Sequence, residues 1–431
     1  MKVGDLQGNP YEPNLGDVAG AQSSYEKALA ISAGLARAES KDAVARRYLA
    51  RSYQSLGEVL PLLGKAKEGA ENIRQATEIF QGLLDASPHD RDLRIQTANC
   101  YESLADLLGH SELQNLGDRT GAIENYSKSL AIFDAMAAED SSDLKARSGA
   151  AVLRIRIGDM LQAQGDLDAA LENYRAALPR AESIAAADPK NERFLRVLAL
   201  SHRKMADAET QKNDLKQALE DIQRASAINE RLADADPDNA QVRANLASSL
   251  TAAAGLLNKT GKPADALQKY RQATAIIENL STASPSDLFT RGQLAEVLIS
   301  MGSTLSSMGR TDEASNATAR GLAIERELAT RVNATADELS RYAISLLTCE
   351  PVVLRQPATA LRFAKQASEK SGEKDVKNLD ILAQAYFRNG DSENALATEE
   401  KVLSLFPQIA SPARKHAEAQ LAIFRRGLQT E

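Results

Sequence analysis

The chain has 431 residues, a formal net charge of -7 and a sequence pI near 5.5. Lysine and arginine form no block or basic stripe, so the sequence lacks the electrostatic footprint of a nucleic-acid-binding protein. No apolar run approaches the ~20 residues that a membrane-spanning helix needs. Aromatic residues make up only 4% of the chain and tryptophan is absent, so we expect a core of alanine, leucine and isoleucine.

An alanine recurs at a nearly fixed interval, and this repeat determines the expected architecture. The first two intervals are 48 and 53 residues and the others are 48, along the series Ala50, Ala98, Ala151, Ala199, Ala247, Ala295 and Ala343. A period of roughly 20 to 50 residues is typical of solenoids, in which each repeat buries its apolar face against its neighbours. The sequence therefore predicts an array that grows along one dimension, rather than the two or three globular domains that its length would suggest.

Each repeat predicts two helices joined by a turn. The turn carries one small or turn-forming residue: Gly16, Gly64, Gly117, Gly165, Asn213, Gly261 or Gly309. The first helix has a small residue shortly before the turn: Gly57, Ala105, Gly158, Ala206, Ala254 or Gly302. In the second helix a large residue at the ninth position after the turn lies on one face with small residues at the fifth and twelfth. Proline at 88, 189, 237 and 285 then ends the second helix.

This pattern resembles the tetratricopeptide repeat. The closest match is the last full unit, where the family's spacing within 34 residues is met by Leu379, Leu382, Ala383, Tyr386, Ala395 and Pro407. The earlier repeats keep the same register but are longer by 14 residues, which is two heptads. The resemblance implies an all-α fold, an α-solenoid wound as a right-handed superhelix of antiparallel helix pairs, whose concave face binds peptides.

The repeat register divides the chain into five parts. Residues 1–40 correspond to the end of a first helix and a complete second helix, and residues 41–335 to six long repeats. A degenerate repeat (336–373), a 34-residue repeat (374–408) and a C-terminal capping helix (409–431) follow. Five extra residues are expected in the loop before Gly117, within residues 110–116. Because residue 1 falls inside a predicted helix, we expect the chain to be a fragment of a longer protein.

The sequence contains no recognisable catalytic or metal-binding motif. The four histidines lie in different repeats without metal-ligand partners at helical spacing. Gly-rich phosphate loops, nucleophile elbows and the zinc-binding His-Glu-x-x-His are not found. Cys100 and Cys349 lie about five repeats apart, so no disulfide between them is expected. We therefore expect no catalysis, no metal site and no cofactor.

Arginine occupies one position of the first helix in five repeats: Arg46, Arg94, Arg147, Arg243 and Arg291. This position lies 11 residues, about three helical turns, before the small residue, so both share one face. Such a ladder could hold an anionic partner. The favoured interpretation is structural, with each arginine at the seam between repeats and paired with an acidic residue near the preceding Asp-Pro loop.

A second column is acidic and follows the small residue directly: Glu58, Asp106, Asp159 and Asp207, with Asp5 in the first partial unit. In the tetratricopeptide family this position lies on the concave face. One interpretation is local pairing on a solvated face, for which Arg156 and Lys204 stand three residues before an aspartate. The other is an acidic groove for a basic or amide-rich segment, helped by Arg51, Asn99 and Arg203.

We expect a non-catalytic scaffold that binds a peptide or protein partner and no nucleic acid. The alternative is a regulatory or sensory module, because the long repeats with Leu-Gly-Asp turns and Ala-Asp-Pro ends resemble arrays that follow the kinase domain in some bacterial serine/threonine protein kinases. No kinase signature lies in this chain, so that resemblance implies a kinase domain upstream of it. We expect a soluble segment in the cytoplasm, or outside it if the parent protein has a membrane segment upstream.

Overall fold

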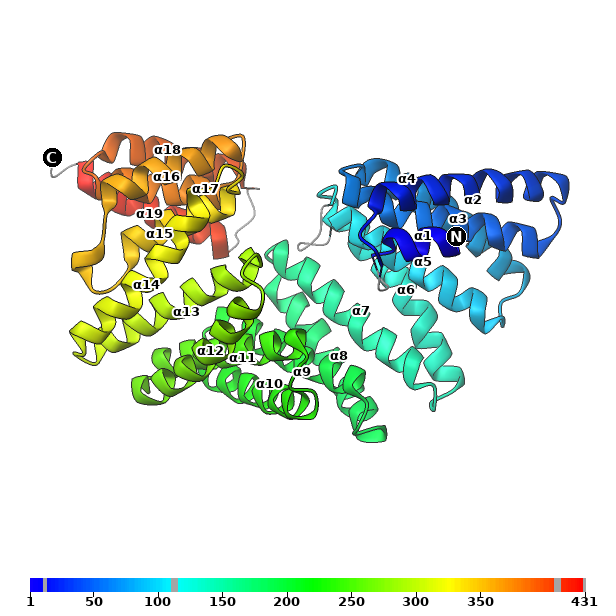
Figure 1. Cartoon of the computed structure of the whole chain (residues 1–431), viewed down its shortest axis with the longest axis horizontal. Coiled ribbons are helices and arrows are strands. Elements are labelled where there is room, and N and C mark those ends of the chain that lie inside the picture. The colour runs from blue at the N-terminus through cyan, green and yellow to red at the C-terminus, as the bar shows by residue number, and fades with distance from the viewer. Residues whose placement is uncertain (11–13, 110–114, 407–411, 429–431) are drawn as a thin grey trace. The chain divides into compact units, whose positions relative to one another are not determined.

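A computed structural model describes residues 1–10, 14–109, 115–406 and 412–428 (Figure 1). Within these residues all regular secondary structure is helical. The described residues form an all-α array of antiparallel helix pairs with a C-terminal capping helix, which confirms the predicted all-α class of helix pairs. The predicted extra loop residues 110–114, the match at Pro407 and the boundary between residues 408 and 409 lie outside the described residues.

The chain forms two compact units, Met1–Lys204 and Met205–Glu431, with the boundary inside helix α9 (Glu192–Gln211). In the first unit consecutive helices pair as hairpins. These hairpins are α1 (Lys2–Gly8) with α2 (Val18–Ala38), α3 (Ala43–Val59) with α4 (Ala66–Ala86), α5 (Arg91–Gly109) with α6 (Arg119–Glu139), and α7 (Leu144–Ala163) with α8 (Leu167–Ala187). A short 3₁₀ helix, η1 (Leu60–Leu63), follows α3.

The second unit continues the same alternation from α10 (Leu215–Ala235). Its hairpins are α11 (Ala240–Lys259) with α12 (Pro263–Ala283), α13 (Leu288–Ser307) with α14 (Thr311–Ala329), α15 (Ala336–Thr348) with α16 (Pro357–Lys370), and α17 (Val376–Arg388) with α18 (Ser392–Leu405). The 3₁₀ helix η2 (Val352–Leu354) lies in the irregular connection between α15 and α16. The last helix, α19 (Pro412–Leu428), packs on α17 and α18, with Ala417, Leu421 and Phe424 buried.

The turns inside the long hairpins each contain one residue in the left-handed region. Their φ angles run from 63° at Asn213 to 88° at Gly165, a conformation that only glycine and asparagine adopt readily. In four turns an aspartate follows, and its side chain accepts a hydrogen bond from a backbone N–H in the first turn of α2, α6, α8 or α10. The Gly-Asp or Asn-Asp pair therefore specifies both the turn and the start of the second helix.

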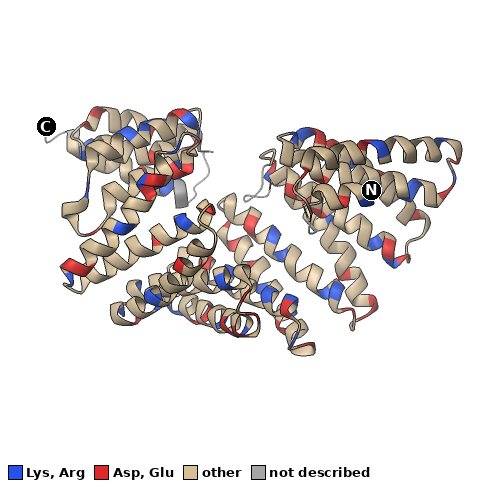
Figure 2. Ribbon diagram, viewed as in Figure 1, with Lys and Arg blue, Asp and Glu red and all other residues tan. Residues whose placement is uncertain are grey.

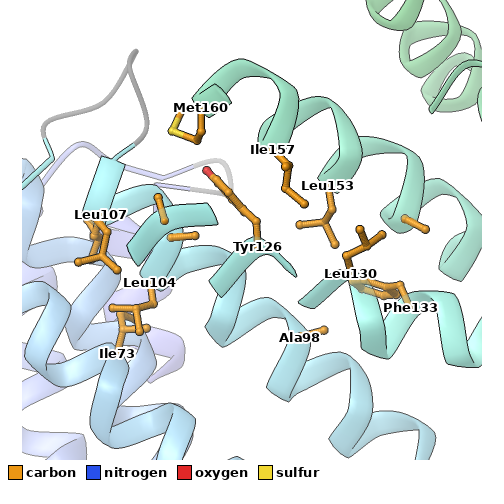
Figure 3. Close-up of a cluster of buried hydrophobic side chains, with 14 of the residues drawn as sticks. Ile73, Ala98, Leu104, Leu107, Tyr126, Leu130, Phe133, Leu153, Ile157 and Met160 are labelled. Atoms are coloured by element: carbon orange, nitrogen blue, oxygen red, sulfur yellow. The ribbon is translucent and has the colours of Figure 1, made fainter. Parts of the chain in front are cut away.

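The hairpin cores depend on a small residue of the first helix that faces a larger residue of the second. A Cβ atom added to Gly158 would lie 2.5 Å from Cε1 of Tyr174, and one added to Gly57 would lie 2.7 Å from Cδ1 of Ile73. In the α5–α6 hairpin Tyr126 is fully buried in a cluster with residues of α5 and of the next first helix, α7 (Figure 3). These contacts set how closely the two helices of each hairpin approach.

Two glycines provide a matched test of this packing. Gly158→Ala places a methyl group against the buried ring of Tyr174, so we expect the free energy of unfolding to fall by about 1–3 kcal/mol through overpacking. Gly255→Ala meets only the Tyr270 hydroxyl at 3.8 Å, so we expect the better helix propensity of alanine to stabilise the chain by up to about 1 kcal/mol. Denaturant titration followed by circular dichroism measures both, and effects of the same sign and size would contradict this account.

Candidate functional site

The acidic column lies on the first helices, and three of its carboxylates accept hydrogen bonds from a tyrosine of the second helix. The bonds are Tyr25 to Asp5 at 2.8 Å, Tyr174 to Asp159 at 2.7 Å, and Tyr126 to Asp106. Each tyrosine ring is almost completely buried, with at most 1% of its surface exposed. Since a buried hydroxyl needs a hydrogen-bond partner, these carboxylates stabilise the hairpin as well as carrying charge.

Two carboxylates of the column also connect neighbouring first helices. Asp159 of α7 forms an ion pair with Lys204 of α9 at 2.8 Å, and only 13% and 18% of the two side chains are exposed. Glu58 of α3 accepts hydrogen bonds from Gln54 at 2.9 Å and from the Ser103 hydroxyl of α5 at 3.1 Å. In the first unit the acidic column therefore consists of half-buried carboxylates that already make hydrogen bonds or ion pairs, rather than of fully solvated charges.

Asp207, the fourth predicted acidic residue, is exposed and belongs to the second unit. Among the predicted polar helpers in the first unit, Arg51 and Asn99 are exposed and Arg203 is half-buried. Arg51 lines a hollow of about 370 Å³ on α3 together with Arg47 and Tyr48. In Figure 2 the Lys and Arg positions (blue) and the Asp and Glu positions (red) are interspersed along the ribbon. The structure thus places Arg51 and Asn99 where a partner could reach them.

Burial alters the protonation of two glutamates on these helices. Loss of solvation raises the pKa of Glu58 to about 7, although the hydrogen bonds from Gln54 and Ser103 oppose the shift. Loss of solvation, with the nearby charge of Asp106, raises the pKa of Glu102 to about 7 against the attraction of two arginines. Sequence reasoning missed Glu102. The sequence does hold a signal for Glu102: it stands four residues before Asp106, so both side chains lie on one face of α5.

Arg94 shows how the arginine column is held. Its guanidinium binds Glu139 at the end of α6, with Nη2 2.9 Å from Oε1, and its Nε donates to the Pro88 carbonyl at 2.6 Å. This side chain is 13% exposed. The preceding Ser87-Pro88 loop therefore contributes a backbone carbonyl, whereas the acidic partner comes from the second helix of the same hairpin.

The other arginines of the column occupy similar positions. Arg147 donates to the Ser183 hydroxyl of α8 and to the Ser141 carbonyl at 3.2 Å. Arg291 forms an ion pair with Glu327 in the last turn of α14. Arg46 and Arg243 are half-buried. The sequence predicted that each arginine pairs with an acidic residue near the preceding loop. This prediction is wrong for Arg94 and Arg291, because each guanidinium reaches across its hairpin to the C-terminal end of the second helix.

The described histidines and cysteines lie on different elements, and Cys100 of α5 is close enough to Glu58 to feel its charge. His202 is 4% exposed, His89 lies 3.3 Å from Arg94, and His110 is outside the described residues. Cys100 and Cys349 are buried free thiols. Among the described residues no group of three or more His, Cys, Asp and Glu side chains could hold a metal ion. None of the described helices combines the length and apolarity that crossing a membrane would require.

Comparison with known proteins gives two kinds of match. A family model described as the bacterial transcriptional activator domain matches residues 104–221. No curated protein matches the chain. Similar solved structures are those of BtubC from P. vanneervenii (16% identical, TM-score 0.38, covering 67% of this chain and 94% of that chain) and a tetratricopeptide repeat protein from Parabacteroides merdae (14% identical, TM-score 0.40, covering 72% and 93%).

A third similar structure is a signal transduction ATPase with numerous domains and a tetratricopeptide repeat sensor from Pyrococcus horikoshii. It is 12% identical, with a TM-score of 0.42, and the match covers 94% of this chain and 55% of that chain.

The tyrosine–carboxylate bonds can be tested by removing one hydroxyl. We expect Tyr126→Phe to lower the free energy of unfolding by about 1.5–3 kcal/mol, because the lost bond is to a carboxylate. Tyr270 is the matched control, since its hydroxyl bonds to the neutral side chains of Ser300 and Asn258, and Tyr270→Phe should cost only about 0.5–1.5 kcal/mol. Denaturant unfolding measures both variants. If Tyr126→Phe lowers the free energy of unfolding less in a chain that already carries Asp106→Asn, the difference is the energy of the Tyr126–Asp106 hydrogen bond.

Glu58 makes stability depend on pH. Its pKa is raised from 4.5 in the unfolded chain to about 7 in the folded one, so the folded state holds the proton more tightly. The stabilisation that the protonated Glu58 contributes is therefore complete below pH 4.5 and is lost as the pH rises through about 7. Glu58→Gln keeps a neutral side chain at every pH. We expect this variant to melt at a higher temperature than the parent at pH 8, and to differ little from it at pH 5, in a series of thermal scans.

Proposed function

We propose that the chain is a non-catalytic protein-interaction scaffold whose first unit binds a basic or amide-rich peptide segment along α3, α5 and α7. One observation carries this proposal: a row of half-buried carboxylates crosses three successive first helices. The row consists of Glu58, Glu102, Asp106 and Asp159. Because the repeats place these groups at regular intervals, an extended segment can contact several of them in turn.

The hydrogen bonds within the row favour binding because they hold the carboxylates in place. Asp106 and Asp159 are fixed by buried tyrosines, and Glu58 is fixed by Ser103. Side chains that are already ordered lose little conformational entropy when a ligand binds. At Asp159 the ligand's cation competes with Lys204, so this position contributes through exchange of ion-pair partners.

Exposed polar side chains beside the row supply hydrogen bonds. Arg51 offers guanidinium donors and Asn99 offers both a donor and an acceptor to the backbone of an extended peptide. Only 4% of the chain is aromatic, so we do not expect a tight interface built on buried tryptophan or tyrosine anchors from this side. Affinity would come from several contacts of modest strength, and salt would weaken them.

A regulatory role inside a larger protein is the second candidate. The match of residues 104–221 to the bacterial transcriptional activator domain favours a regulatory binding module. The resemblance of the long repeats to arrays in bacterial serine/threonine kinases favours the same class. Reading the gene upstream of residue 1 tests the kinase alternative: an encoded kinase domain supports it, and a stop codon at that point contradicts it.

The binding proposal predicts that charge in the row, rather than total charge, controls affinity. We expect Asp106→Asn with Asp159→Asn to weaken binding of a fluorescein-labelled nona-arginine peptide several-fold in anisotropy titrations. Asparagine can still accept the tyrosine hydroxyl, so the hairpins should remain folded. The control is Glu78→Gln with Glu172→Gln, two exposed sites on the second helices α4 and α8 that change the net charge equally.

If both double variants bind the peptide equally weakly, the proposal is contradicted, because only the overall charge of the chain would then control affinity. The pH gives a further comparison. Since the carboxyl groups of Glu58 and Glu102 have pKa values of about 7, the row becomes more negative between pH 6 and pH 8. The peptide should therefore bind more tightly at pH 8 than at pH 6, and Glu58→Gln with Glu102→Gln should reduce this difference.

A further inference from the structure

A hollow of about 570 Å³ in the first unit is lined by residues of α6, α7 and α8. Arg147 of α7 and Arg180 of α8 line it together with Asp134 of α6, and Arg154 of α7 binds the same aspartate. We refer to these three arginines and Asp134 as the arginine cluster. None of the four carboxylates of the row lines the hollow, so the cluster is a separate site.

Two arginines of the cluster depart from the repeat pattern. Arg180 stands 15 positions after its turn residue, where the second helices of the other long hairpins all have isoleucine: Ile31, Ile79, Ile132, Ile228, Ile276 and Ile324. Arg154 stands three positions after the recurring alanine, where the other repeats have an aromatic residue, histidine or leucine: Tyr53, Tyr101, His202, Leu250, Leu298 and Leu346. Since the other hairpins fold without these arginines, the fold itself does not require the cluster.

The cluster holds more positive than negative charge. Asp134 is shared, because its Oδ2 lies 3.3 Å from Nη2 of Arg154 and its Oδ1 lies 3.4 Å from Nη2 of Arg180. Arg147 donates to a serine hydroxyl and to a backbone carbonyl, which are both neutral. Within the described part of the chain, the Nε of Arg154 is buried without a hydrogen-bond partner. Three guanidinium groups thus face one carboxylate, which leaves a surplus of two positive charges.

Other acidic residues near the cluster in sequence do not balance this surplus. Glu139 and Asp143 form ion pairs with arginines of α5. Asp140 accepts hydrogen bonds from the backbone and the hydroxyl of Ser142. Glu182 of α8 is exposed and does not line the hollow. The uncompensated guanidinium groups therefore favour an anionic ligand from outside the chain.

We propose that the arginine cluster binds a phosphate monoester, carried either by a small molecule or by a phosphorylated side chain. A phosphate monoester has about 1.5 to 2 negative charges at pH 7, which matches the surplus of the cluster, whereas a carboxylate has only one. Its oxygens can accept hydrogen bonds from several guanidinium groups at once, and the planar fork of arginine fits them in pairs. The volume of the hollow lies within the range of roughly 300–1,000 Å³ that is typical of small-ligand pockets.

Isothermal titration calorimetry of the full chain at constant ionic strength tests this proposal with two probes, glycerol phosphate and a glycine-flanked phosphoserine peptide. We expect saturable binding that Arg180→Ile weakens at least about tenfold, because the phosphate loses one guanidinium partner. Arg180→Ile restores the residue of the other second helices, so the hairpin should remain folded. Arg154→Tyr is a second variant with the same expected loss, and tyrosine already stands at the equivalent positions 53 and 101.

Arg175→Ile is the matched control, because Arg175 is exposed on α8 and does not line the hollow, yet its loss changes the net charge equally. This variant should bind both probes as the parent does. The probe that binds more tightly identifies the source of the phosphate group, a small molecule or a phosphorylated side chain. Three results would overturn the proposal: no saturable binding of either probe, equal weakening by Arg175→Ile, or equal affinity for a peptide with glutamate in place of phosphoserine.

Discussion

The contact between a small residue of the first helix and a larger residue of the second is the constraint on which the other features depend. Glycine at 158 lets α7 approach α8 so closely that any side chain there would overlap the Tyr174 ring. The same approach brings the tyrosine hydroxyl to the carboxylate of the next residue, Asp159. The acidic column therefore follows the small column by one position for a packing reason, in addition to any role in binding.

Where isoleucine replaces tyrosine in the second helix, the carboxylate is bonded differently. Ile73 fills the space beside Gly57 but offers no hydroxyl, and Glu58 instead bonds to Gln54 and to Ser103 of the next first helix. Buried without a nearby cation among these partners, the carboxyl group of Glu58 has a pKa near 7. Burial thus makes Glu58 a pH-sensitive member of the surface that we propose for binding.

Much of the fold could be predicted because the repeat fixes register. The turn residues and the small-on-large pairs recur at a nearly constant interval, so a single alignment of the chain with itself locates them, together with the aspartate that follows four of the turn residues. The bonds of the charged side chains could not be predicted in this way. Arg94 reaches across its hairpin to Glu139, and Asp159 pairs with Lys204 of another hairpin. Such choices depend on side-chain rotamers and on which neighbour lies within reach, neither of which follows from the period.

The repeat also explains why the carboxylate row has polar chemistry. The row lies on the first helices, where polar residues meet solvent and can select a charged partner. Asp5 extends the acidic column into the α1–α2 hairpin, where the buried Tyr25 donates a hydrogen bond to its carboxylate. Gly4 lies against the Tyr25 ring just as Gly158 lies against the Tyr174 ring, so the same close packing positions the first member of the column and the later ones.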